Sequence, residues 1–187
     1  MTKVIFEDLT LAGAVLIDLD LLEDERGFFA RSYHDDEFAA NGLNTLWPQH
    51  NISYNVDAGT LRGMHINAAP HGEIKLVRCT SGSIYDVIVD LRPASDAHLS
   101  WIGVEISAAN RRSLYVPAGF GHGFITLADE TTVEYLMGSV YVEAAARGFR
   151  WDDPAVGIRW PVDPVVIAER DATYPDLGRA LLEEVAL

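Results

Sequence analysis

The sequence predicts an all-β protein built as a sandwich or a barrel. Its 187 residues, 49% of them hydrophobic, are enough for one domain with a sizeable core. Beyond residue 45, short apolar stretches follow one another at close spacing, and turns containing Gly, Pro, Asn or Asp separate them. This pattern is typical of short antiparallel strands that cover a common core. We therefore expect a single domain over residues 1–187.

The N-terminal part predicts two strands and a short helix. Residues 15–21 alternate apolar and acidic side chains, which is the pattern of a half-buried strand. A turn at 24–27 leads into a second expected strand over 28–33. Residues 34–41 are expected to form a helix, because three acidic residues occupy its first turn and Gly42 follows its end.

The main series of strands follows. We expect them at residues 46–55, 74–80, 84–91, 101–106, 113–116, 123–127 and 132–140. Ser81 and Gly82 predict a β-hairpin between the second and third of these strands. Residues 176–187 differ, because their apolar residues recur at helical spacing. We expect them to form a helix packed on the outside of the barrel.

Composition excludes several classes of function. The formal net charge of −14 argues against non-specific binding of nucleic acid or anionic membranes, since both need a basic surface. The one cysteine, Cys79, permits no intrachain disulfide and fits a reducing compartment. Residues 1–8 lack the layout of a secretion signal, and the apolar run 9–22 is too short and too charged to span a bilayer. We expect a soluble, cytoplasmic protein.

Three basic side chains stand in segments that otherwise have the character of buried strands: Arg62, His65 and Lys75. A β-protein interior excludes such groups unless they are paired or used. Strict alternation places Arg62 and His65 on opposite faces of a strand. They can line one pocket if Gly63 permits a bulge, and we expect that distortion.

The segment 117–122 has the pattern P-x-G-x-x-H, which resembles the second motif of the cupin superfamily of jelly-roll barrels. In the first cupin motif, His65 takes the place of one metal-binding histidine. The second histidine position holds Asn67, the glutamate position holds Lys75, and the later asparagine position holds Thr126. Most of a metal-binding shell is therefore missing, and a cation at residue 75 repels a metal. We expect no metal and no cofactor.

The remaining groups suit acid–base chemistry. His65 can accept a proton near neutral pH, and Lys75 can stabilise negative charge that develops on an oxygen. Tyr135 can donate a proton from a strand face, with Tyr141 as a rival of the same parity. A base, an acid and an oxyanion stabiliser suit removal of a proton next to a carbonyl and its return from the other side. That reaction is a cofactor-independent epimerisation.

Ordered blocks of sequence carry a more specific resemblance, over about residues 5–177. The blocks are residues 24–29, 49–53, 61–65, 75–78, 86–92, 117–124, Tyr135, 147–154 and 160–161. They resemble the dTDP-4-dehydrorhamnose 3,5-epimerases. The resemblance implies a jelly-roll barrel, an active homodimer, and epimerisation at C3, C5 or both of a nucleotide-linked 4-keto-6-deoxy sugar. The nucleotide is taken as dTDP, and the product serves deoxysugar biosynthesis such as that of dTDP-L-rhamnose.

The same resemblance implies the roles of individual residues. His65 matches the catalytic base and Asp171 the carboxylate that orients it, Tyr135 matches the acid, and Lys75 matches the lysine beside the C4 oxygen. Substrate-binding positions are matched by Arg26, Phe29, Gln49, Asn51, Arg62 and His122. Of these, Arg62 matches a diphosphate-binding arginine, while Arg26 and Phe29 match residues that hold the nucleotide partly across the dimer.

The chain departs from the family pattern at the rim of the cleft, at Arg31, Ile66, Asn67 and Glu73. Two alternatives follow from the residues. One is a metal-dependent cupin enzyme with His65, Glu73 and His122 as ligands. The other is a non-catalytic cupin that binds a nucleotide sugar.

Overall fold

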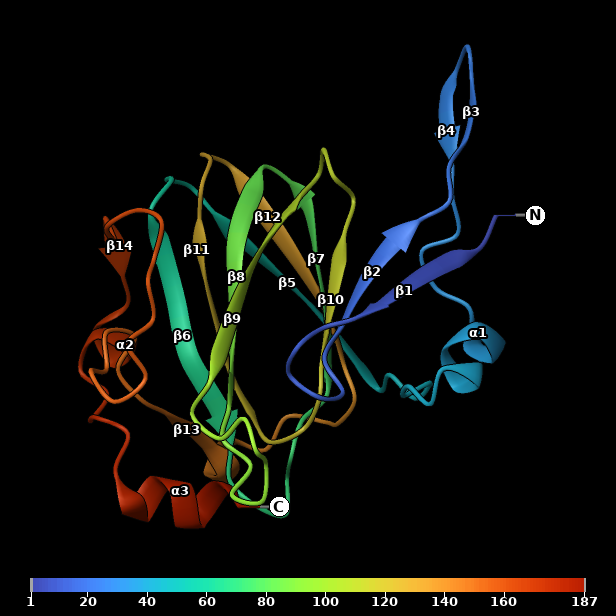
Figure 1. The fold of residues 1–187 in the computed structure, drawn as a ribbon. Helices are drawn as coiled ribbons and strands as arrows, with labels where there is room; N and C mark the ends of the chain where they lie inside the picture. The colour runs from blue at the N-terminus through green and yellow to red at the C-terminus, as the bar shows by residue number, and fades with distance from the viewer. Residues whose placement is uncertain (1, 187) are drawn as a thin grey trace.

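Two β-sheets face each other in the computed structural model, which describes residues 2–186 (Figure 1). In spatial order, the first sheet contains β1 (Val4–Asp8), β2 (Val15–Leu19), β10 (Ser113–Val116), β7 (Lys75–Ser81), β12 (Thr131–Met137) and β5 (Gln49–Asn55). The second contains β13 (Ala146–Gly148), β6 (Thr60–Asn67), β11 (Phe120–Thr126), β8 (Ser83–Asp90) and β9 (Trp101–Ser107). The short strand β14 (Val166–Ile167) pairs in parallel with β6, and the other pairings are antiparallel. The predicted antiparallel jelly-roll barrel is confirmed.

Apolar side chains fill the space between the sheets and also cover both outer faces. Val77 and Val133 of the first sheet meet Ile88 and Phe124 of the second in the central cluster. A second cluster covers the outer face of the second sheet, and a third covers the outer face of the first. Because both faces are covered, a strand such as β11 is buried along its whole length instead of alternating.

The N-terminal segment forms a projecting hairpin and a covering helix. β3 (Leu22–Asp24) and β4 (Gly27–Phe29) pair with each other and extend away from the barrel (Figure 1). The predicted strand over 28–33 is therefore wrong beyond residue 29. The predicted helix is confirmed as α1 (Asp35–Ala40), whose buried Phe38 packs edge-on against Phe6 at 5.3 Å between ring centroids.

The predicted hairpin at Ser81 and Gly82 is wrong. β7 pairs with β10 and β12, whereas β8 pairs with β11 and β9 in the other sheet. The turn therefore carries the chain from one sheet to the other. Gly82 has a φ of +73°, and an added Cβ would lie 2.2 Å from the Thr131 Oγ1. A tight glycine turn is needed here, but long-range pairing decides which strands it joins.

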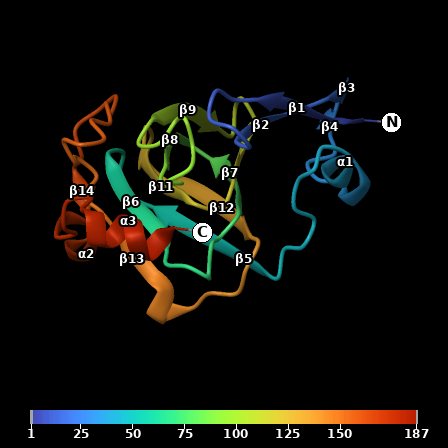
Figure 2. The same cartoon turned by 60° about the horizontal axis from the view of Figure 1, so that its bottom comes forward.

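The C-terminal segment lies against the outside of the second sheet, on the opposite side of the barrel from α1 (Figure 2). It contains a 3-10 turn, Glu143–Ala145, and the helices α2 (Glu169–Ala172) and α3 (Arg179–Val185). The predicted terminal helix is confirmed in α3, which is shorter than residues 176–187, and Leu187 lies outside the described residues. Its Val185 is buried in one cluster with Met64 and Phe149.

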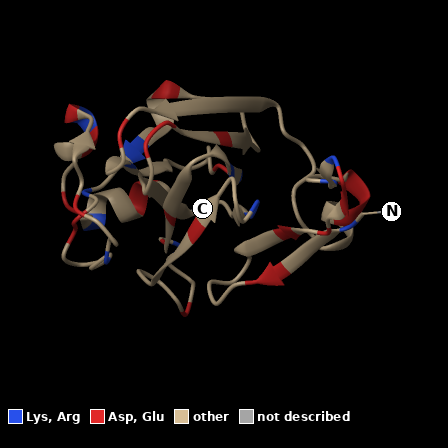
Figure 3. Ribbon diagram, turned by 90° about the horizontal axis from the view of Figure 1, so that it is seen from above, with Lys and Arg blue, Asp and Glu red and all other residues tan. Residues whose placement is uncertain are grey.

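The distribution of acidic residues and the character of the helices are consistent with the composition. Figure 3 shows Asp and Glu on elements at both ends of the molecule, in line with the net charge of −14. In the described part of the chain, the helices lack the length and apolar character needed to cross a membrane.

Candidate active site

Two adjoining chambers lie where β5, β6, β7 and β12 meet. The Tyr135 chamber, of about 240 Å³, is lined by Asn51, Ile52, Ser53, Arg62, His65, Lys75, His122, Phe124, Tyr135 and Met137. The Tyr141 chamber, of about 170 Å³, is lined by Gln49, Asn51, His65, Ile66, Asn67, Glu73, Lys75, Met137, Tyr141, Ala146, Arg147, Arg170 and Tyr174. His65 and Lys75 line both chambers. Of the residues predicted from sequence, the structure brings Asn51, Arg62, His65, Lys75, His122 and Tyr135 to one pocket.

The candidate base and the candidate acid come from facing sheets. His65 lies on β6 of the second sheet, while Lys75 on β7 and Tyr135 on β12 belong to the first sheet. A substrate bound between them would therefore have the imidazole on one wall and the phenol on the other.

The expected bulge at Gly63 is present. On β11, His122 pairs with His65 and Phe124 pairs with Arg62, so β6 carries one extra residue in this stretch. Gly63 has a φ of +137°, and an added Cβ would lie 2.6 Å from the Cα of Gly123. A residue with a side chain does not fit this conformation. Because of the bulge, the Arg62 and His65 side chains line the same chamber.

Asp171 on α2 joins the bulge to the candidate base. Its Oδ1 lies 3.0 Å from Nε2 of His65, and its Oδ2 accepts a hydrogen bond of 3.0 Å from the Gly63 N–H. Burial raises the pKa of Asp171, but the hydrogen bonds from His65 and Gly63 outweigh this and lower the pKa overall. The carboxylate therefore stays ionised beside the imidazole.

The His65 imidazole is held neutral at neutral pH. Burial lowers its pKa below the ordinary value of 6.5, and the nearby charges of Lys75 and Arg170 lower it further, although Asp171 opposes them. Arg170 Nη2 lies 3.2 Å from the His65 Nε2, and its Nε donates to Asp171 Oδ1 at 3.1 Å. Arg170 was not predicted from the sequence. The one feature that could have indicated it is its position directly before Asp171. In the tautomer whose Nε2 hydrogen points to Asp171, Nδ1 is left to accept a proton.

Tyr135 is a half-buried phenol whose hydroxyl meets a polar partner. Its hydroxyl lies 2.9 Å from Oγ of Ser53, and burial raises its pKa well above the ordinary value. The phenol is therefore protonated at neutral pH and can act as an acid. The rival Tyr141 lines the other chamber, is 53% exposed, and donates its backbone N–H to Oε1 of Gln49 at 3.0 Å.

Two further polar pairs line the chambers. The ammonium group of Lys75 lies 3.5 Å from the Glu73 carboxylate, and both side chains are nearly buried. His122 Nε2 lies 2.7 Å from Oδ1 of Asp86, which is fully buried and has no partner for its Oδ2 among the described residues. Asp86 lies in a block that carried the family resemblance, but nothing in the sequence singled it out as the partner of His122.

The alternative metal ligands are not brought together as a metal site. His65 is engaged with Asp171, His122 with Asp86, and Glu73 with Lys75. Within residues 2–186, no group of three His, Cys, Asp or Glu side chains is placed to hold a metal ion.

Arg26 and Phe29 do not reach the chambers within one chain. They lie on the projecting hairpin, where Arg26 bonds to Asp24 and Phe29 is 66% exposed. Arg31, one of the departures from the family pattern, lies 3.6 Å from the Glu37 carboxylate of α1. The Arg31 side chain therefore forms an ion pair with the helix that follows it in the chain.

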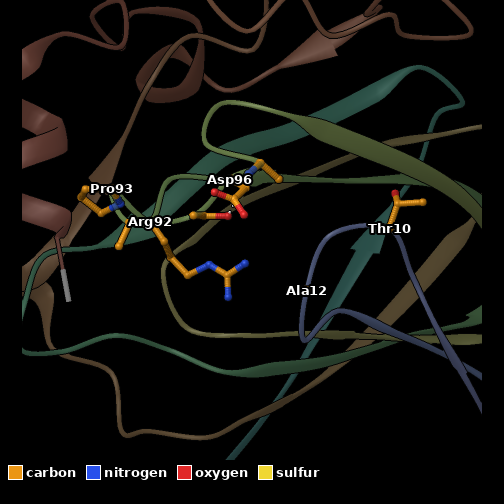
Figure 4. Close-up of a pocket in the computed structure, with 8 residues that line it drawn as sticks. Thr10, Ala12, Arg92, Pro93 and Asp96 are labelled. Atoms are coloured by element: carbon orange, nitrogen blue, oxygen red, sulfur yellow. Dashed lines mark hydrogen bonds between the residues drawn. The ribbon is translucent and has the colours of Figure 1, made fainter.

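A larger cavity of about 630 Å³ lies elsewhere, between the turn after β1 and the loop after β8 (Figure 4). Its one basic residue, Arg92, donates to both carboxylate oxygens of Asp90 and stacks on the Phe120 ring at 4.5 Å. The cavity shares no lining residue with the two chambers.

Comparison with known proteins identifies the family. The family model for dTDP-4-dehydrorhamnose 3,5-epimerase matches residues 8–179. The chain is 41% identical to the dTDP-4-dehydrorhamnose 3,5-epimerase of Methanothermobacter thermautotrophicus over 95% of this chain and 96% of the relative. It is 38% identical to the dTDP-4-dehydrorhamnose 3-epimerase of Streptomyces niveus over 87% and 79%.

A solved structure agrees with these relatives. The crystal structure of dTDP-4-dehydrorhamnose 3,5-epimerase from Bacillus anthracis str. Ames with TDP and PPi bound superposes with a TM-score of 0.89. It is 38% identical in sequence and covers 95% of this chain and 100% of its own. The chain therefore belongs to the dTDP-4-dehydrorhamnose 3,5-epimerase family and is a carbohydrate epimerase.

Proposed function

We propose that this protein inverts C3, C5 or both of a dTDP-linked 4-keto-6-deoxy sugar, in deoxysugar biosynthesis, and that the two chambers are its active site. One observation carries the proposal. The neutral His65, hydrogen-bonded to Asp171, and the half-buried, protonated Tyr135 line the same chamber from facing sheets, and Lys75 lines it with them. A base and an acid on opposite walls are what inversion of a carbon centre requires.

The reaction follows from the states of these groups. The C4 ketone acidifies the neighbouring C–H bond, and neutral His65 takes that proton while Asp171 stabilises the imidazolium that forms. The electron pair moves onto the C4 oxygen, where the Lys75 ammonium stabilises the enolate. Tyr135 then gives its proton to the carbon from the facing wall. Each positioned acid or base of this kind contributes about 10²–10⁴-fold to the rate.

A direct test uses dTDP-4-keto-6-deoxyglucose in D₂O, with deuterium at C3 and C5 read separately by NMR. Incorporation at both carbons indicates a double epimerase and incorporation at one a single epimerase, which matters because relatives of both kinds have similar identity. His65→Asn and Tyr135→Phe should abolish the incorporation. Full activity in either variant, or no incorporation by the wild type, would contradict the proposal.

We also propose that the active form is a homodimer in which Arg26 and Phe29 of one chain complete the site of the other. The hairpin that carries them projects from the barrel, and its neighbouring Phe28 is stacked under Arg111 at 4.5 Å, which fixes the direction of projection. Leu22, Phe28 and Phe29 are exposed together on this hairpin, and a grouped apolar surface of this kind supports a protein contact there.

Subunit mixing tests this arrangement. Arg26→Ala and His65→Asn chains should each be impaired alone. After mixing and exchange, a heterodimer holds one site with an intact His65 and an intact Arg26 from the other chain, so activity should recover. If Arg26 served its own chain, every site in the heterodimer would be defective and no recovery would occur.

A further inference from the structure

We infer that Asn55 is a positioning residue that holds the Arg62 guanidinium in place for the diphosphate of the substrate. The inference rests on the proposed function, in which Arg62 binds that group. Asn55 lies outside the lining of both chambers. It would nevertheless control how tightly the protein binds the nucleotide end of the substrate.

The amide of Asn55 is fixed from both sides. Asn55 is the last residue of β5, is 2% exposed, and pairs in the sheet with Thr131. Its Oδ1 accepts a hydrogen bond of 2.7 Å from the Arg62 Nε, and its Nδ2 donates to the Thr131 backbone oxygen at 3.0 Å. Because the carbonyl oxygen of Thr131 can only accept, the amide has one satisfactory orientation, with its oxygen toward Arg62.

This contact determines which edge of the guanidinium remains available. Nε is taken by Asn55, and Nη2 lies 3.4 Å from the Tyr54 backbone oxygen. The Nη1 group and the second hydrogen of Nη2 remain for a ligand, and together they suit two oxygens of a phosphate. Arg62 is otherwise exposed, so without Asn55 its long side chain would have to be ordered at the cost of binding energy.

The neutrality of Asn55 matters as much as its geometry. Among the described residues, no Asp or Glu forms an ion pair with Arg62. An amide oxygen orients the guanidinium and leaves its positive charge uncompensated, ready for an anion. An aspartate at the same position would orient it equally well but would cancel that charge and set a carboxylate against the Thr131 carbonyl.

The test measures binding of dTDP to the full-length protein by calorimetry, with wild type, Asn55→Ala, Asn55→Asp, Arg62→Ala and the double variant Asn55→Ala/Arg62→Ala. We expect Asn55→Ala to weaken binding about tenfold, since hydrogen bonds to charged groups are among the stronger ones. Asn55→Asp should weaken it at least as much. The double variant should bind no more weakly than Arg62→Ala. With substrate, KM should rise while kcat changes little.

Asn110 provides a matched control. Its amide also bonds on both sides, to the backbone of Ser107 and Glu105, at a site away from the chambers. Asn110→Ala should lower stability without changing the affinity for dTDP.

Since Asn55→Asp keeps the size of the side chain and the acceptor for Arg62, it remains informative if Asn55→Ala does not fold.

The outcomes separate this inference from the proposed function. Equal weakening by Asn55→Ala with and without Arg62 would overturn the inference while leaving the diphosphate role of Arg62 intact. Wild-type affinity for dTDP in Arg62→Ala would overturn both this inference and the diphosphate role of Arg62. Failure of the wild type to bind dTDP would instead contradict the proposed substrate class.

Discussion

Arg62 and His65 line the same chamber although they lie three residues apart on β6. One extra residue at Gly63, set against β11, turns both side chains to one side of the sheet. The same distortion directs the Gly63 N–H to Oδ2 of Asp171, whose Oδ1 meets His65. One glycine therefore places Arg62, the proposed base His65 and its carboxylate Asp171 relative to one another.

Gly63→Ala should be severely destabilising. The new Cβ would lie 2.6 Å from the Gly123 Cα at a φ of +137°, so backbone must move against backbone. We expect the free energy of unfolding to fall by more than about 3 kcal/mol, measured by urea denaturation. Gly157→Ala is the control, since Gly157 also has a positive φ, +66°, but nothing lies within 4 Å of its Cβ position. That variant should lose about 1–2 kcal/mol. Equal losses in the two variants would show that the close packing of Gly63 is unimportant.

The acidic limb of the kcat/KM profile should lie below pH 6.5. Burial lowers the pKa of His65, and this limb reports protonation of the base in the free enzyme. Arg170→Met removes a charge that lowers this pKa, so the limb should move to higher pH. Asp171→Asn removes interactions that raise it, so the limb should move to lower pH while kcat falls about 10²–10⁴-fold. Shifts in the same direction would contradict the assignment of His65 as the base.

His65 should also make stability depend on pH. Its pKa is lower in the folded protein than the ordinary 6.5, so between those two values the unfolded chain binds more protons. The contribution is fully present above pH 6.5 and is lost as pH falls through the folded pKa. The difference in unfolding free energy between wild type and His65→Asn should therefore shrink as the buffer is taken below pH 6.5. A difference that stays constant would show that His65 is not perturbed.

Tyr135→Phe and Tyr141→Phe should differ in effect. Tyr135 is half-buried, has a raised pKa and shares its chamber with His122 and Arg62, whereas Tyr141 is 53% exposed in the other chamber. Tyr135→Phe should lower the rate of epimerisation by about 10²–10⁴-fold, and Tyr141→Phe should retain deuterium incorporation in D₂O. Since Phe preserves the ring in both cases, the melting temperature serves as the control for folding. The reverse order of activities would make Tyr141 the acid.

Much of the fold could be predicted locally. Turn residues and apolar periodicity placed α1, α3 and most of the strands, because each depends on residues close in the chain. The hairpin predicted at Ser81 and Gly82 failed for the opposite reason, since the glycine turn is local but the partners of β7 and β8 come from distant segments. The short β14 and α2 carry too few residues for any periodicity to be read.

The chemical character of the site could also be read from the sequence alone. Lys75 stands where a metal-binding cupin carries glutamate, and the alternation of β6 requires a bulge at Gly63 if Arg62 and His65 share a pocket. The tertiary structure decided the partners. Ser53 meets Tyr135 through the register of β5 against β12, whereas Asn55 meets Arg62 from the facing sheet. Asp171 meets His65 across 106 residues of chain. The chemistry of a side chain is a property of the residue, whereas its pKa and its orientation are set by neighbours that folding brings from elsewhere.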